Sequence, residues 1–158
     1  MAFEVTTHSK KISPSIVFDT AAYSVGDCMG GKITLTNAVR KPGGRAIIND
    51  IMVINNDGTK PTFNVVIFSQ NPTAATLTDN AAIVYSTDIN NIHAVIPIYA
   101  VDYLGAATAK FANVPLGNII VQETSGTSTS LYAAIVATAV NDLTLATDLA
   151  IKIGVTQD

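Results

Sequence analysis

The segment from Gly26 to Lys32 has the residue types and spacing of a phosphate-binding loop. Its sequence, Gly26-Asp27-Cys28-Met29-Gly30-Gly31-Lys32, fits that motif as far as the lysine. The chemistry then requires a Ser or Thr to hold Mg²⁺, and a helix whose first amides face the phosphates. Here Ile33 follows the lysine, and residues 33–36 have the pattern of a strand. We therefore predict no nucleotide binding.

The two histidines and the single cysteine offer little support for a metal site or a nucleophile. His8 and His93 lie far apart, and neither has a second ligand at metal spacing. Cys28 has no neighbouring base to stabilise a thiolate and no partner for a disulfide within the chain. We predict a surface His8, a His93 at a strand edge, a partly buried Cys28, and neither a metal nor a cofactor.

Acid–base and triad chemistry depend on residues that meet only in space, so spacing leaves both open. Glu4 and Glu123 are the only glutamates, and no G-x-S-x-G motif is present. Several aspartates occupy turn sequences, where capping and turn chemistry is the usual role; these are Asp57, Asp79, Asp88 and Asp142. The segment 125–128 also reads as a turn. We predict that the chain is not an enzyme.

Basic residues are concentrated in two short stretches. They are Lys10 and Lys11 near the N-terminus, and Lys32, Arg40, Lys41 and Arg45 further along. Such residues either line a solvated loop or contact an acidic neighbouring subunit, where they would guide register more than affinity. We keep both interpretations and take these six residues as candidate subunit contacts.

Four tyrosines provide an alternative binding function. Sandwich domains that bind carbohydrate usually present exposed aromatic side chains to sugar rings, and Tyr85, Tyr99, Tyr103 and Tyr132 are candidates. They are scattered in the sequence. Burial of each ring with its hydroxyl at the surface is the simpler interpretation.

The composition favours a surface that other subunits cover. Charged residues make up 13% of the 158 residues, where about 25% is typical. Uncharged polar surface costs less to desolvate than charged surface, which suits a protein interface. The net charge of −3 gives no electrostatic support for binding nucleic acid or an anionic membrane. The start of the sequence lacks the features of a signal peptide, so we expect synthesis in a reducing cytosol.

The pattern along the chain predicts an all-β, antiparallel β-sandwich of about eight or nine strands. Residues 1–15 read as a polar N-terminal arm and residues 16–158 as one domain. The turn sequence at 55–58 predicts a hairpin between 46–54 and 62–69. We expect 69–91 to be a long connection between the two sheets, with helical turns starting at Thr78 and Asp88. Further strands are expected at 32–36, 93–100, 117–122, 130–139 and 148–155.

Several stretches resemble small virion proteins of tailed bacteriophages, in particular the capsid decoration (cement, or auxiliary head) proteins. The resemblance rests on residues 23–27, 31–38, 66–68, 71–73, 76–82, 131–136 and 148–158. It implies a jelly-roll-like fold and a place on the outer surface of the capsid of a virion assembled in the bacterial cytoplasm. The implied partners are the major capsid protein and further copies of the chain, as a dimer or trimer. Other virion positions (tail, neck or fibre) and a carbohydrate-binding, host-recognition module remain alternatives.

Overall fold

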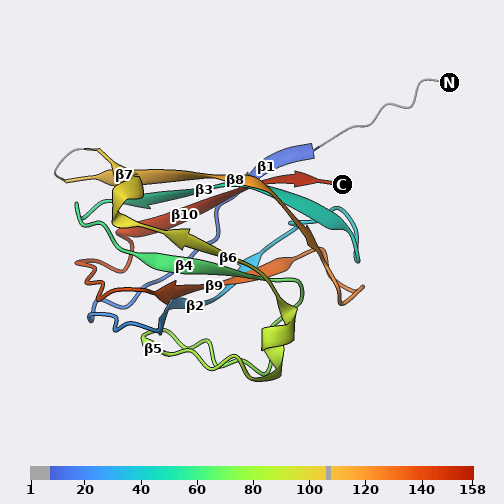
Figure 1. Cartoon of the computed structure of the whole chain (residues 1–158), viewed down its shortest axis with the longest axis horizontal. Helices are drawn as coiled ribbons and strands as arrows, with labels where there is room; N and C mark the ends of the chain where they lie inside the picture. The colour runs from blue at the N-terminus through green and yellow to red at the C-terminus, as the bar shows by residue number, and fades with distance from the viewer. Residues whose placement is uncertain (1–7, 106–107) are drawn as a thin grey trace.

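Two five-stranded antiparallel sheets face each other in the computed structural model, which describes residues 8–105 and 108–158 (Figure 1). The β3 sheet contains, in spatial order, β1 (His8–Ile12), β10 (Leu149–Gln157), β3 (Arg45–Asn55), β8 (Lys110–Gln122) and β7 (Tyr103–Leu104). The β4 sheet contains β5 (Ala81–Ala82), β2 (Asp27–Leu35), β9 (Leu131–Ala137), β4 (Phe63–Phe68) and β6 (Ile92–Ile98). Two 3₁₀ helices, η1 (Ser86–Asn91) and η2 (Ala100–Asp102), flank β6. Within the described ranges, no helix has the length and apolar content needed to cross a membrane.

The order of the long strands is that of a jelly roll. Without the two-residue strands β5 and β7, the sheets read β1-β10-β3-β8 and β2-β9-β4-β6. The first strand thus pairs with the last, and the chain changes sheet after each of β1, β2 and β3. Two interlocked Greek keys on facing sheets define this fold. The predicted all-β antiparallel sandwich is confirmed.

The main core fills the space between the sheets because the strands alternate apolar and polar residues. In β10, Ile151, Ile153 and Val155 are buried, whereas Ala150 is exposed and Lys152 half-buried. β3 and β9 also direct every second side chain into this core, but their other faces are apolar as well, as at Met52 and Ala134. Each such Leu, Ile or Val contributes roughly 1.5–3 kcal/mol when fully buried, as an upper value.

A second, smaller core lies on the outside of the β4 sheet. The connection between β4 and β6 runs along this side, away from the β3 sheet (Figure 1). It carries Leu77, Ile83 and Tyr85, which pack on a buried cluster of Cys28, Val66, Phe68 and Ala134. The β4 sheet is therefore covered on both faces, which explains why β4 is almost continuously buried.

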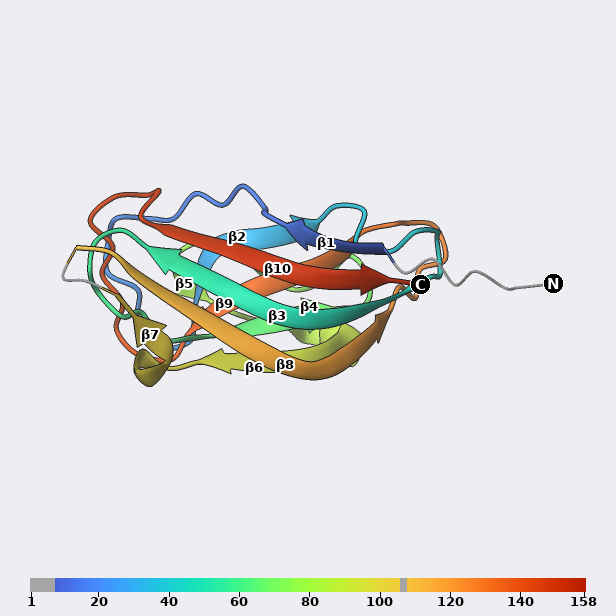
Figure 2. The ribbon, with the colours of Figure 1, turned by 90° about the horizontal axis from the view of Figure 1, so that it is seen from above.

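Among residues 8–105 and 108–158, no segment covers the outside of the β3 sheet (Figure 2). Figure 2 looks onto this face, with β1, β10, β3 and β8 side by side and no segment crossing them. We call the outer side of these strands the open face.

The structure differs from the predicted N-terminal arm at residues 8–12. These form β1, which pairs with β10 from His8 opposite Gln157 to Ile12 opposite Ile153. Residues 1–7 of the predicted arm lie outside the described residues. The reason for the difference is that a strand 145 residues away supplies the backbone partners, and a polar five-residue strand at a sheet edge has no strong local signal.

The predicted hairpin between 46–54 and 62–69 is wrong. β3 pairs with β10 and β8, whereas β4 pairs with β6 and β9 in the opposite sheet. The turn residues at 55–58 are present, but the segment that they begin crosses from the β3 sheet to the β4 sheet. Asn55 and Thr59 donate hydrogen bonds to Asp57, which fixes that crossing.

Three further expectations need correction. The 69–91 connection joins neighbouring strands of one sheet and does not cross between sheets. Of its two expected helical turns, the one near Asp88 is present as η1, whereas residues after Thr78 lead into β5. The strand expected at 117–122 begins earlier, at Lys110, because a register shift opposite Ile48 and Asp50 lets β8 continue past Pro115.

Candidate interaction surface

Three of the six basic candidates gather at one end of the sandwich, where the C-terminus also lies. Arg40 and Lys41 line a hollow of about 350 Å³ together with Asp158. Arg45 begins β3 and accepts a hydrogen bond on its carbonyl oxygen from the backbone N–H of Asp158. Arg45 and Asp158 also border an adjacent hollow of about 210 Å³ that contains Ile47 and Ile120. This end therefore combines basic, acidic and apolar side chains.

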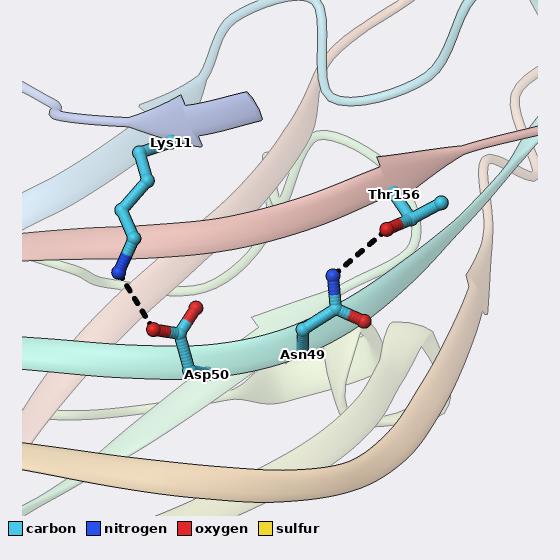
Figure 3. A network of polar contacts seen from close by, with 4 residues as sticks. All are labelled: Lys11, Asn49, Asp50 and Thr156. Atoms are coloured by element: carbon cyan, nitrogen blue, oxygen red, sulfur yellow. Dashed lines mark hydrogen bonds and ion pairs between the residues drawn. The ribbon is translucent and has the colours of Figure 1, made fainter. Parts of the chain in front are cut away.

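Lys11 lies on the open face, where it is engaged in an ion pair. Its Nζ is 2.6 Å from Oδ2 of Asp50, which belongs to β3, two strands away (Figure 3). Gly154 of β10 lies between them in register with both residues. A Cβ at that position would lie 1.8 Å from Oδ1 of Asp50, so the absence of a side chain makes the ion pair possible.

A second polar contact lies beside this pair on the open face. Asn49 donates from Nδ2 to Oγ1 of Thr156 over 2.8 Å (Figure 3). The hydroxyl of Ser9 is 2.9 Å from the same oxygen. Asn49 is the extra residue of the bulge in β3, which lets it reach across to β10. The polar groups at this part of the face thus satisfy one another.

Apolar side chains flank these polar contacts. Phe111, Ile120 and Leu104 are 45%, 56% and 63% exposed. Register places Leu104 and Ile54 beside Phe111, and Ile47 beside Ile120. This surface was not predicted from the sequence, because the two faces of 46–54 cannot be assigned without the partner strands. The alternation at 112–116 marks the side of β8 that packs against the core, and does not mark the exposed Phe111 and Ile120.

The remaining two basic candidates do not line the two hollows beside Asp158. Lys10 is half-buried on β1, and Lys32 lies on β2 of the other sheet, where Nζ donates to Oδ1 of Asn71 over 2.9 Å. The six candidates therefore do not form one patch. Their role as contacts stays a prediction.

Glu123 joins loops 36–44 and 123–130 at the end of the sandwich where Arg40, Lys41 and Arg45 lie, which we call the basic end. It is buried, and its carboxylate accepts hydrogen bonds from the backbone N–H groups of Gly43, Ser125 and Gly126 over 2.8–3.0 Å, and from the Ser125 hydroxyl. Desolvation is the largest single influence and raises the pKa of Glu123. The four hydrogen bonds together outweigh it, so the pKa lies below the ordinary value of 4.5. The role of Glu123 is to hold loops 36–44 and 123–130 together.

The segment that resembles a phosphate-binding loop is part of strand β2. Gly30 and Gly31 have positive φ angles and form an irregularity where the register with β9 shifts. The Gly30 N–H donates to Oδ1 of Asp79, which also accepts from the Tyr23 hydroxyl. Its amide is thus already bound within the protein. Cys28 in the same strand is fully buried, and desolvation raises the pKa of its thiol to about 12.

The other chemical candidates are dispersed. His8 and His93 lie on different sheets. Asp57 and Asp88 accept hydrogen bonds from nearby chain segments, as turn residues do, whereas Asp142 is exposed in a loop. Glu4 lies outside the described residues. Across 8–105 and 108–158, no three His, Cys, Asp or Glu side chains are grouped so that they could hold a metal ion.

The tyrosines do not form an exposed aromatic surface. Tyr103 is buried, and its hydroxyl donates to the Pro61 carbonyl oxygen over 2.8 Å. Tyr85 packs against Phe68 in the second core, and only Tyr99 among the four candidates is exposed.

Comparisons with known proteins find similarity only at the level of solved structures. No protein-family model matches the chain, and no curated protein matches it. The chain is similar to part of "Structure of infectious bursal disease virus Gx strain", with a TM-score of 0.42, 17% identity, and coverage of 96% of this chain and 32% of that chain. It thus spans about a third of that viral chain. For "Sacbrood virus of honeybee - expansion state II" the TM-score is 0.29 and the identity 8%, over 89% of this chain and 78% of that chain. Similarity this distant does not indicate what the chain binds.

Proposed function

We propose that the chain is a structural virion protein, namely a decoration protein that binds the outer surface of a tailed-phage head. In this role it contacts the major capsid protein and stabilises the shell through subunit contacts, without a catalytic step. The observation that carries the proposal is the open face, a broad sheet surface that exposes Phe111, Ile120 and Leu104. Exposed apolar patches of this kind mark sites of protein–protein interaction.

A jelly-roll fold is compatible with this role but also occurs in proteins with other functions. Jelly rolls occur in viral capsid domains, in lectins and in cupins. The surface favours the first class, because a charged fraction of 13% keeps the desolvation cost of subunit contacts low. The tyrosines support a glycan-binding role poorly, since Tyr103 is buried and Tyr85 packs in the second core.

The basic end of the sandwich would then guide attachment. Arg40, Lys41 and Arg45 lie there with Asp158, and mixed charges at the rim of an interface affect register and association rate more than affinity. We therefore expect capsid binding to slow at high ionic strength, with a smaller effect on the equilibrium constant.

Co-sedimentation with phage heads that lack the protein tests the proposal. The purified chain is incubated with heads across a concentration range, and bound protein is measured in the pellet. The proposal predicts saturable binding and a higher temperature of head rupture. Heads of an unrelated phage serve as the control. Absence of the chain from the pellet at every concentration, with heads that are no more heat-resistant, would contradict the decoration role.

A further inference from the structure

We propose that two copies of the chain associate face to face through the open face. The inference concerns the purified protein in the absence of a capsid and does not depend on a role in a virion; on a phage head, the capsid surface would replace the second copy on the open face. The surface consists of the outer side of β1, β10, β3 and β8, with an apolar part formed by Ile47, Met52, Ile54, Leu104, Phe111 and Ile120.

The free edges of the two sheets are poor sites for association. An edge strand pairs readily with another chain unless charges, proline or shortness prevent it. β1 carries Lys10 and Lys11, and β6 carries Pro97. β5 and β7 have two residues each and pair only with residues 27–28 of β2 and 111–112 of β8, so the rest of β2 and β8 also lies at a sheet edge. β8 carries Pro115 in that part, and β2 has Gly30 and Gly31 with positive φ angles at its register shift, and both features disfavour edge pairing.

The two outer faces of the sandwich differ in how far the described part of the chain covers them. The β4 sheet is covered by the chain's own connection, which buries Val66 and Phe68. In the described part of the chain, no corresponding segment covers Phe111 or Ile120 on the β3 sheet, and both remain about half exposed. The open face is thus a sheet surface that retains apolar area to lose on association, although exposed apolar side chains such as Val84 and Ile89 also lie on the cover of the β4 sheet.

The size of the open face matches the needs of a dimer. The strands β1, β10, β3 and β8 have 5, 9, 11 and 13 residues, and strands rise about 3.4 Å per residue and lie about 4.8 Å apart. These dimensions give a projected area of about 620 Å² for the four strands. A stable dimer interface covers about 800 Å² of accessible surface per partner. Accessible surface exceeds projected area because side chains make it uneven, so this face alone is sufficient.

The charges of the open face allow a second copy as the occupant and restrict its arrangement. Asp50 is the only acid in the strands of the β3 sheet, and it is neutralised by Lys11. Asn49 and Ser9 both contact the Thr156 hydroxyl. Lys152 and Arg45 lie on the same side of β10 and β3, so two copies avoid like-charge repulsion only in an arrangement that keeps these cations apart.

The mass of the full chain in solution, measured by light scattering across a concentration series, tests this inference. The wild-type chain is expected at twice the 16.5 kDa of one chain. A variant with Phe111→Asp and Ile120→Asp places a charge at each of two apolar positions that the interface would bury. Its mass in solution is expected to be that of one chain. A control variant with Val95→Asp and Val140→Asp adds the same charges at exposed positions away from the face, and is expected to remain dimeric.

Circular dichroism of all three proteins confirms that the substitutions leave the fold intact. A wild-type chain that is monomeric up to the highest soluble concentration overturns the inference, even if it binds phage heads. An oligomer that survives Phe111→Asp with Ile120→Asp also overturns it. Failure to bind heads, with the dimer intact and the face variant monomeric, would instead contradict the decoration role and leave the dimer standing.

Discussion

Lys11 reaches across an entire strand to Asp50, with its ammonium nitrogen 2.6 Å from the carboxylate, although the two residues are 39 positions apart. The intervening strand contributes Gly154, whose missing side chain leaves room for the contact. The ion pair attaches the N-terminal strand β1 to β3 in addition to its backbone pairing with β10. A surface contact thus helps to hold the outermost long strand of the jelly roll in place.

Substitution of Gly154 by Ala tests this relationship. The new Cβ would lie 1.8 Å from Asp50 Oδ1, so the carboxylate must turn away from Lys11. We expect the free energy of unfolding to fall by about 1 kcal/mol in urea titrations. Gly117→Ala is the matched control, because its Cβ would meet no atom within 4 Å, and we expect a change within about 0.5 kcal/mol. Equal stability of the two variants would argue against a steric role for Gly154.

A double-mutant cycle of Lys11→Ala and Asp50→Ala measures the ion pair itself. The Lys11 side chain is 46% exposed and that of Asp50 21%, so solvent screens the interaction. We expect a coupling free energy of about 0.2–1 kcal/mol at low salt that declines in 1 M NaCl. The corresponding cycle of Lys152 with Asp50 serves as the comparison. A coupling that does not respond to salt would contradict an electrostatic origin.

Acid should weaken the junction that Glu123 forms between its two loops. The folded pKa of Glu123 lies below the ordinary value of 4.5. A carboxylate with a lowered pKa stabilises the fold above its unfolded pKa, and this stability is lost as the pH falls through the folded pKa. Glu123→Gln should therefore be less stable than wild type by about 1.5–3 kcal/mol at pH 7.

Urea titrations from pH 7 to pH 3 check the sign of this effect. The difference between wild type and Glu123→Gln should be constant above about pH 5 and shrink below the ordinary pKa. Asp142→Asn, in an exposed loop, is the control and should show little difference at any pH. A difference that grows toward pH 3 would disprove the assigned role.

Asp88 should control the order of the cover on the β4 sheet. Its Oδ2 accepts the backbone N–H groups of Ala74 and Ala75 over 2.6 and 2.7 Å, and Oδ1 accepts from Asn91. Asp88→Ala removes these acceptors, and each lost bond to a charged group is worth about 1.5–3 kcal/mol. We expect faster hydrogen exchange at Ala74 and Ala75, with strands of the β3 sheet unaffected. Uniformly faster exchange throughout the chain would show that the connection does not open locally.

Cys28 should resist alkylation in the folded protein. Its side chain is fully buried, and desolvation raises the thiol pKa to about 12. The reactive thiolate is therefore scarce and inaccessible at pH 8. We expect a thiol reagent to modify the native chain at least about 100-fold more slowly than the urea-unfolded chain, since the pKa difference from an ordinary thiol of about 8.5 alone gives such a factor. Rapid native labelling would contradict the second core.

Local pattern was sufficient for the strands with clear alternation. The segment 148–155 was predicted and is β10 (Leu149–Gln157), because its apolar residues recur at every second position. The fold class followed from several such segments. The Asn55–Gly58 sequence was correctly read as a change of direction, but its partner was misassigned because turn residues do not specify which strands pair.

The arrangement of the candidate surface depends on contacts that are distant in sequence. β1 pairs with a strand at the opposite end of the chain, and no feature of His8–Ile12 identifies that strand. Asp50 meets Lys11 only after the bulge at Asn49 and the register with Gly154 are fixed. The open face was missed for the same reason, since the apolar run of β3 gives no indication of which side is covered.

The position of the chain on purified phage particles tests the central claim most directly. Antibody labelling against the folded chain, viewed by electron microscopy, would locate it and be compared with particles that lack its gene. The account predicts label over the outer surface of the head and heads that rupture at lower temperature when the chain is missing. Label confined to the tail or fibres, or no label on intact particles, would contradict a role in head decoration.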